Sequence, residues 1–115
     1  MPEHHSKKRG QSMAYELRIT EHAEEQLDPL VNYLLYQFQS KQAVRHLLDG
    51  IDNVYDRLEV NPLQFPYCRD VYLSKKGYHE AVVPQMDYMI VFGIEENIVN
   101  VVGIFHQLEN YPQKL

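Results

Sequence analysis

The sequence of 115 residues contains one cysteine and no tryptophan. The lone thiol, Cys68, cannot form an internal disulfide and has no second cysteine at metal-ligating spacing, which favours a reducing compartment such as the cytoplasm. No apolar run approaches the roughly 18 residues that a membrane-spanning helix needs. The basic N-terminus, with Lys7, Lys8 and Arg9, is not followed by an apolar stretch, so no secretory signal is predicted.

Positive charge is also scarce. Residues 1–12 carry three of the 11 basic and one of the 16 acidic residues, which leaves 8 basic and 15 acidic residues, a net charge of −7, in residues 13–115. Proteins that grip RNA or DNA usually present a basic face to the phosphates. The charge therefore argues against tight unassisted binding to nucleic acid, although it allows a local basic cleft. We expect residues 1–12 to be a disordered leader or a tag remnant, and residues 13–115 to form one domain.

Hydrophobic periodicity predicts an α+β fold that begins with one strand and a helix. Apolar and polar residues alternate over residues 15–19, the pattern of a half-buried strand. Thr20 suits a helix N-cap, and apolar residues at helical spacing predict an amphipathic helix over residues 21–38. Pro29 lies inside this helix and is expected to kink it, or to split it near residues 26–28.

A second helix is predicted directly after the first. Ser40 can cap it, and its apolar positions run from Ala43 to Leu58 before Asn61 and Pro62 stop it. Because only two residues separate the helical patterns, we expect an antiparallel helical hairpin.

The last third of the chain predicts three strands, over residues 79–83, 88–94 and 98–105. The preceding segment, residues 61–76, has the composition of a loop with a short strand at residues 71–73. The last strand is apolar at nearly every position, which is typical of a central strand covered on both faces. Together these elements predict a mainly antiparallel, twisted sheet of about four strands. The helical hairpin would cover one face, and the other face would be a partly open, concave surface.

The order and spacing of these elements resemble the RelE/ParE superfamily of toxins from type II toxin-antitoxin systems. The matching segments span residues 14–115, and their similarity lies in order and spacing rather than in any single motif. They are YELRITEHAEEQLDPLVNYL, RLEVNPLQFP, GYHEAVV, DYMIVFGIEENIVNVVGIFH and NYP.

The resemblance implies a bacterial, cytoplasmic toxin that a cognate antitoxin neutralises, with no cofactor and no metal. RelE-like members are mRNA interferases that act at the ribosome and inhibit translation. For this chain the resemblance thus implies a metal-independent endoribonuclease. Two alternatives stay open: a ParE-like inhibitor of DNA gyrase, and a non-toxic family member that only binds its antitoxin. None of the three involves a membrane.

Metal-free RNA cleavage needs a base, an acid and cations that stabilise the charge on the phosphate. His106 is the candidate for acid or base, because an imidazole can take up and release a proton near neutral pH. Arg69 is the candidate phosphate clamp, Glu80 a candidate carboxylate base, and Tyr111 a candidate for positioning the substrate. The alternative roles are structural: a hydrogen bond to backbone for His106, an ion pair with Asp70 or another local acid for Arg69, and packing on the sheet for Tyr111.

Three further residues are candidates for binding the substrate: Lys75, Lys76 and His79. The two lysines equally fit a solvated turn. His79 follows Gly-Tyr at a position where toxins of this family commonly carry arginine. Asp87 and Gln107 also stand where such toxins often carry arginine, so the candidate site has fewer cations than the resemblance implies.

Overall fold

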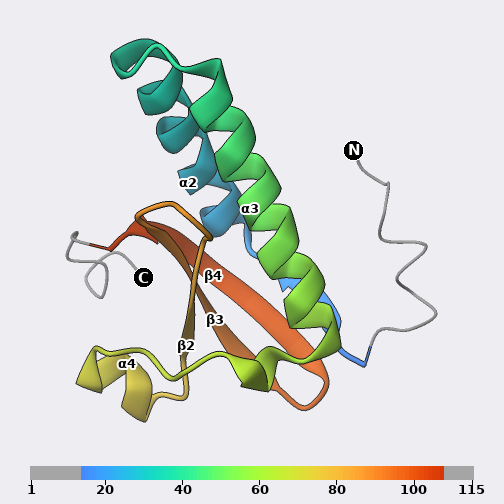
Figure 1. Cartoon of the computed structure of the whole chain (residues 1–115). Helices are drawn as coiled ribbons and strands as arrows, with labels where there is room; N and C mark the ends of the chain where they lie inside the picture. Colours follow the sequence, from blue (N-terminus) through green and yellow to red (C-terminus); the bar gives the residue numbers. More distant parts are fainter. Residues whose placement is uncertain (1–13, 108–115) are drawn as a thin grey trace.

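The computed structural model describes residues 14–107, so residues 1–12 and Tyr111 lie outside the described residues. Figure 1 shows helices α2 and α3 packed on one side of a four-stranded sheet. The short helix α4 lies beside one end of strand β2. Within residues 14–107, no helix is both long and apolar enough to cross a membrane.

The sheet consists of β1 (Glu16–Ile19), β2 (His79–Val82), β3 (Tyr88–Glu95) and β4 (Ile98–His106), in the order β1-β4-β3-β2. β1 pairs with β4 in parallel, and the other two pairings are antiparallel. The prediction of a mainly antiparallel sheet is therefore confirmed. So is the central position of the last strand, since β4 has a partner on each side.

The first helix differs from its predicted length. Helix α2 spans Glu21–Asn32, and the Thr20 hydroxyl accepts a hydrogen bond from the Ala23 amide at 3.1 Å, as expected of an N-cap. α2 passes through Pro29 without a break, so the predicted split near residues 26–28 is wrong. The chain changes instead to a π-helix at Tyr33–Gln37, where the Phe38 amide donates to the Tyr33 carbonyl at 3.3 Å.

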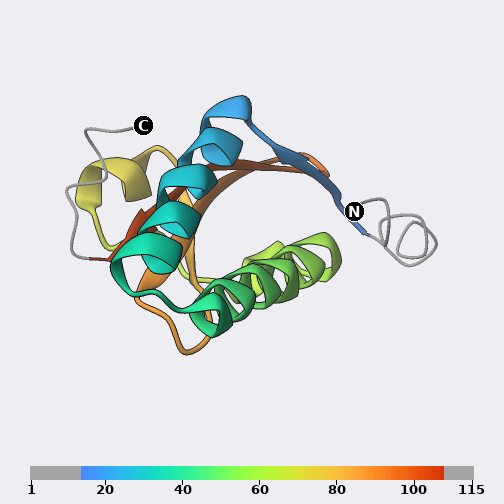
Figure 2. The same ribbon diagram turned by 90° about the horizontal axis from the view of Figure 1, so that it is seen from above.

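The second helix follows its prediction closely. Helix α3 spans Lys41–Val60, and the Ser40 hydroxyl accepts from the Ala43 amide at 3.0 Å. Asn61 ends the helix, and a short 3₁₀ helix follows at Pro62–Gln64. Figure 2 shows α2 and α3 side by side over the sheet, diverging from the end at which they are joined. The helical hairpin is thus confirmed.

One predicted strand is wrong. Residues 71–73 belong to helix α4 (Val71–Lys75), not to a strand. The reason is local: the Asp70 carboxylate accepts a hydrogen bond from the Leu73 amide at 2.9 Å and so caps a helical turn. Leu73 is then directed into the protein, where it is 2% exposed.

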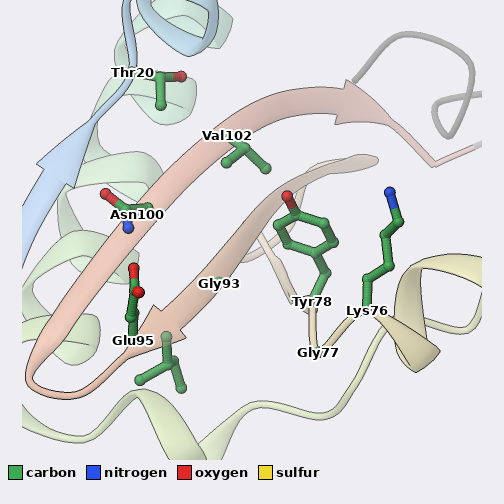
Figure 3. A pocket seen from close by; sticks show the side chains of 9 residues that line it. Thr20, Lys76, Gly77, Tyr78, Gly93, Glu95, Asn100 and Val102 are labelled. Carbon is green, nitrogen blue, oxygen red and sulfur yellow. The ribbon is translucent and has the colours of Figure 1, made fainter.

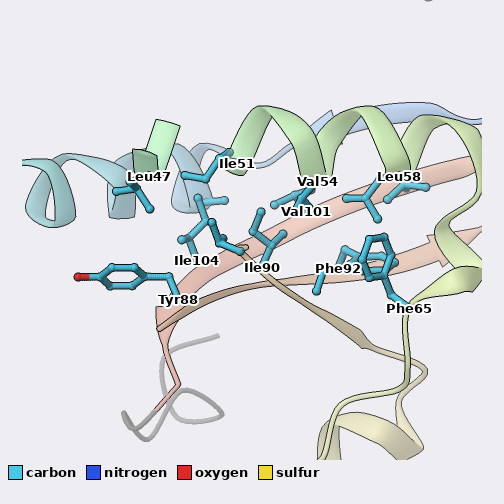
Figure 4. Close-up of a cluster of buried hydrophobic side chains, with 14 of the residues drawn as sticks. Leu47, Ile51, Val54, Leu58, Phe65, Tyr88, Ile90, Phe92, Val101 and Ile104 are labelled. Atoms are coloured by element: carbon cyan, nitrogen blue, oxygen red, sulfur yellow. The ribbon is translucent and has the colours of Figure 1, made fainter. Parts of the chain in front are cut away.

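The sheet carries an apolar cluster on each face. The larger cluster lies between the sheet and the hairpin, and Figure 4 shows side chains of β3 and β4 meeting those of α3. The smaller cluster contains Cys68, Leu73, Met89, Val91 and Phe105, with Tyr78 and Val102 packed against it. α4 therefore covers part of the face opposite the hairpin.

A bulge in β4 decides which face the end of that strand presents. Val91 pairs with Gly103 but Phe92 pairs with Val101, so Val102 is an extra residue on β4. Without the bulge, alternation from Val101 would turn residues 103 and 105 toward the hairpin. With it, Ile104 joins the hairpin-side cluster and Phe105 joins the cluster on the opposite face.

Candidate functional site

Arg69 and Glu80 form the main polar contact on the face opposite the hairpin. The Glu80 carboxylate accepts from the Arg69 Nε at 2.9 Å and from the Arg69 backbone amide at 3.2 Å. The Arg69 Nη2 also donates to the Gln107 side-chain oxygen at 3.4 Å. The Arg69 side chain is 67% exposed, whereas that of Glu80 is 5% exposed. The ion pair predicted as the structural alternative for Arg69 is therefore present, with Glu80 as the acid.

Backbone pairing brings these two residues together. The Glu80 amide donates to the Pro66 carbonyl at 3.0 Å, and the Cys68 amide donates to the Tyr78 carbonyl at 3.0 Å. The segment before α4 thus runs beside the start of β2. Arg69 is consequently fixed next to Glu80 although the two are 11 positions apart in sequence.

Lys75 is the last residue of α4, and Lys76, the C-cap, lines an open groove on the face of the sheet that carries the Arg69–Glu80 pair. Lys76, Tyr78, Asn100 and Val102 are among the residues that line this groove of about 440 Å³ (Figure 3). The Lys76 Nζ is 4.7 Å from the centre of the Tyr72 ring, and a hydrogen bond with the Tyr72 phenol raises the pKa of Lys76. Lys76 is therefore a fully charged cation at the edge of a concave surface.

His79 is buried on the hairpin side of the sheet. Its ring is stacked between Tyr67, with centroids 4.3 Å apart, and Phe92, at 5.3 Å. Its Nδ1 is 3.1 Å from the Phe65 carbonyl oxygen, which can only accept, so Nδ1 carries the proton. This geometry gives His79 a packing role. Because its side chain is buried, the structure does not support the predicted contact with substrate.

His106 also faces the hairpin side. Its ring meets that of Tyr88 edge to face, with centroids 5.4 Å apart. It lines a hollow of about 380 Å³ between the tip of the helical hairpin and the turn that joins β2 to β3. His106 reaches this hollow because the bulge at Val102 reverses the alternation of β4.

The structure thus brings some of the predicted site residues together and separates others. Arg69 and Glu80 meet on one face of the sheet, with Lys76 beside the groove on that face. His106 and His79 lie on the other face, with the sheet between them and the Arg69–Glu80 pair. Within residues 14–107, no cluster of three or more histidine, cysteine, aspartate or glutamate side chains could hold a metal ion.

Cys68 lies in the small cluster beside this ion pair and is 4% exposed. Burial, together with the negative charges of Glu80 and Asp70, raises the pKa of its thiol from 9.0 to about 12. The thiol therefore stays protonated in the folded protein at neutral pH, and Cys68 is not an activated nucleophile.

We expect the stability of the fold to fall as the pH rises above about 9, in part because of this thiol. In the unfolded chain the thiol ionises from its ordinary pKa upward, whereas the folded chain keeps it protonated to about pH 12, so high pH favours unfolding. Melting temperatures measured between pH 7 and pH 11 would test this. The melting temperature of Cys68→Ala should fall less steeply with pH than that of the wild type. Equal slopes for the two proteins would contradict the role given to this thiol.

Two features of these surfaces were absent from the sequence-based prediction. Gln107 entered it only as a missing arginine, yet its side chain accepts from Arg69. The hollow around His106 is lined by Tyr33 and Phe38 from one segment and by Asp87 and Tyr88 from another, and the two segments are distant in sequence. Gly103 was the available signal, because a glycine inside a strand often marks a bulge.

Comparison with known proteins agrees with this fold. Residues 17–111 match the family described as "ParE toxin of type II toxin-antitoxin system, parDE". A chain from the chromosomal ParDE toxin-antitoxin system of P. aeruginosa is 14% identical, with a TM-score of 0.60, covering 81% of this chain and 96% of that one. A chain from the RelBE2 toxin-antitoxin complex of Mycobacterium tuberculosis is 16% identical, with a TM-score of 0.56, covering 84% of this chain and 95% of that one. No curated protein sequence matches significantly.

The family match covers far more than half of the chain, and both solved structures are similar to this chain in overall fold. The expected RelE/ParE fold is confirmed. The chain therefore belongs to the ParE toxin family of type II toxin-antitoxin systems, within the RelE/ParE superfamily.

Proposed function

We propose that this toxin acts in the bacterial cytoplasm by binding a protein target, and that a cognate antitoxin neutralises it. DNA gyrase is the target that the resemblance to ParE-like members implies. The observation that carries the proposal is the position of His106, which lies on the opposite face of the sheet from Arg69 and Glu80. An acid or base and a cation must meet at one phosphate for RNA cleavage.

The electrostatics of the Arg69 region support the same proposal. The Arg69 guanidinium is held by the Glu80 carboxylate, which offsets its charge where an RNA phosphate would approach. The whole chain has a net charge of −5, which adds to the repulsion of an RNA phosphate. A protein partner with basic residues fits this surface better than a polyanion does.

The mRNA interferase remains the second candidate, because two cations stay accessible on the concave face. The Arg69 side chain is largely exposed despite its ion pair, and Lys76 lines the groove beside Tyr78. On this alternative, Tyr78 would stack on a base and the two cations would contact phosphates of the ribosome-bound message.

Two assays on the purified chain separate these candidates. The first measures inhibition of DNA supercoiling by gyrase, and the second measures cleavage of mRNA on translating ribosomes. We expect inhibition of gyrase and no cleavage, with Arg69→Gln as active as the wild type once its melting temperature shows that it is folded. Cleavage that is lost in Arg69→Gln would support the interferase instead.

The divergence of α2 and α3 leaves a surface suited to the antitoxin. A hollow of about 380 Å³ between them is lined mainly by apolar side chains, including Leu27, Leu48 and Ile104, with Glu24 and Asp52 also lining it. An antitoxin segment with apolar residues on one side and basic residues on the other would fit it. We place the antitoxin contact here.

Leu48→Arg is expected to weaken binding of the antitoxin encoded beside this chain by at least tenfold, about 1.4 kcal/mol. Leu48 is 38% exposed, so the long side chain can reach solvent without unfolding α3, but its charge would occupy the apolar hollow. Co-purification followed by titration calorimetry would measure the loss. Leu63→Arg, at a residue that is 63% exposed outside the hollow, is the matched control and should bind normally. Equal weakening by both variants would contradict this placement.

A further inference from the structure

The hollow beside His106 combines aromatic walls with an acidic side chain. Its walls include Tyr33 and Phe38 from the hairpin tip, Tyr88 from β3 and His106 from β4. Asp87, directly before β3, lines the same hollow, and no lining residue is a lysine or an arginine. Among the described residues, Asp87 belongs to neither the Arg18–Glu16 nor the Arg69–Glu80 ion pair.

The hollow is held open by backbone on both sides. On the hairpin side, the π-helix turn places Tyr33 and Phe38 with their ring centroids 5.2 Å apart, and the Ser40 amide donates to the Leu34 carbonyl at 3.0 Å. On the sheet side, the Asp87 carbonyl accepts from the Gln107 amide at 2.9 Å. The backbone on both sides of the hollow is therefore held by hydrogen bonds.

The exposure of these rings is unusual for a surface that meets only water. Phe38 is 61% exposed and Tyr33 is 45% exposed, while Tyr88 at the base of the hollow is 6% exposed. Aromatic faces carry negative potential and attract cations, and an adjacent carboxylate strengthens that attraction. A cation with a flat, weakly hydrated head satisfies both features, and guanidinium matches this better than ammonium does.

We propose that this hollow binds the side chain of an arginine displayed by a protein partner. The Tyr33 and Phe38 rings are tilted by 55° to each other, so the guanidinium lies against the face of Phe38, the more exposed of the two, and donates hydrogen bonds to the Asp87 carboxylate. Charge complementarity identifies the occupant, since the whole chain has a net charge of −5 and Asp87 places one of its acids in a hollow whose described lining contains no lysine or arginine. The proposal concerns the chemistry of the bound group and holds whether or not the partner is gyrase.

The test uses the full chain and N-acetyl-arginine amide as the probe, with binding followed by backbone amide shifts in NMR spectra. We expect saturable shifts at Ala43, Met86 and Tyr88, in the millimolar range that a single side chain gives. N-acetyl-citrulline amide has the same shape without the charge, and it should cause no saturable shift. N-acetyl-lysine amide should bind more weakly than the arginine probe.

Asp87→Asn keeps the size of the side chain and should weaken arginine binding about fivefold. Glu95→Gln makes the same change of charge at the opposite end of β3 and should bind like the wild type. Phe38→Ala, at an exposed position, should also weaken binding without unfolding the chain. The proposal is overturned if citrulline or lysine binds as well as arginine, if no shift occurs at these residues, or if Glu95→Gln weakens binding as much as Asp87→Asn.

Discussion

Replacing Phe92 by alanine is expected to lower the free energy of unfolding by about 4 kcal/mol, which is within the usual cost of deleting a buried aromatic ring. Phe92 is fully buried at the centre of the hairpin-side cluster. Its ring stacks on His79 and meets Phe65 edge to face at 6.0 Å. The loss would combine removal of apolar contact with a cavity that the paired strands β3 and β4 cannot close.

Urea denaturation monitored by circular dichroism would measure this loss. Val82→Ala is the matched control, because Val82 lies in the neighbouring strand but is 44% exposed. That variant should cost less than about 1 kcal/mol, as expected of a substitution at the surface. A loss below about 2 kcal/mol for Phe92→Ala would mean that the core relaxes around the missing ring.

His79→Arg is expected to lower the free energy of unfolding by about 3 kcal/mol, because a guanidinium would replace a buried, hydrogen-bonded ring. Arginine is common at this position in the superfamily that the sequence resembles, so the substitution tests whether a missing charge or a packed ring defines the site. The imidazole lies between Tyr67 and Phe92 and donates to the Phe65 carbonyl. Arginine could still donate to the Phe65 carbonyl, but it would bring a positive charge into a buried position where these three neighbours supply no carboxylate.

His79→Phe separates the two contributions. A phenyl ring keeps the stack and loses only the hydrogen bond, so it should cost about 1 kcal/mol. Thermal and urea unfolding of both variants would measure the difference. If His79→Arg is as stable as the wild type and gains RNA cleavage, the ring is not structural and the residue belongs to a phosphate site.

The elements with strong local patterns could be predicted from the sequence. Thr20 and Ser40 cap the two long helices as expected, and Asn61 ends the second. The short elements were harder, because a single side-chain hydrogen bond decides them. The composition of residues 71–73 predicts a strand. They form a helix because the Asp70 carboxylate accepts a hydrogen bond from the Leu73 amide and caps the first turn.

The candidate site was less predictable than the fold, because it depends on which face of the sheet each side chain occupies. One extra residue at Val102 turns His106 toward the hairpin, and sequence spacing alone does not place a bulge within an apolar strand. The Arg69–Glu80 pair depends on a backbone pairing between the segment before α4 and β2, which no local pattern encodes. Tyr111 lies outside the described residues, so its predicted role stays a prediction.

We propose that this toxin acts on a protein target rather than on RNA. The most direct measurement is tightly induced expression of the chain in a bacterium, with pulse-labelling of DNA and protein synthesis at short times. We predict that DNA synthesis falls first, and that Arg69→Gln and His106→Gln, which lie on opposite faces of the sheet, each leave that fall in place. An early fall in protein synthesis that either substitution relieves would contradict the claim and assign the chain to the mRNA interferases.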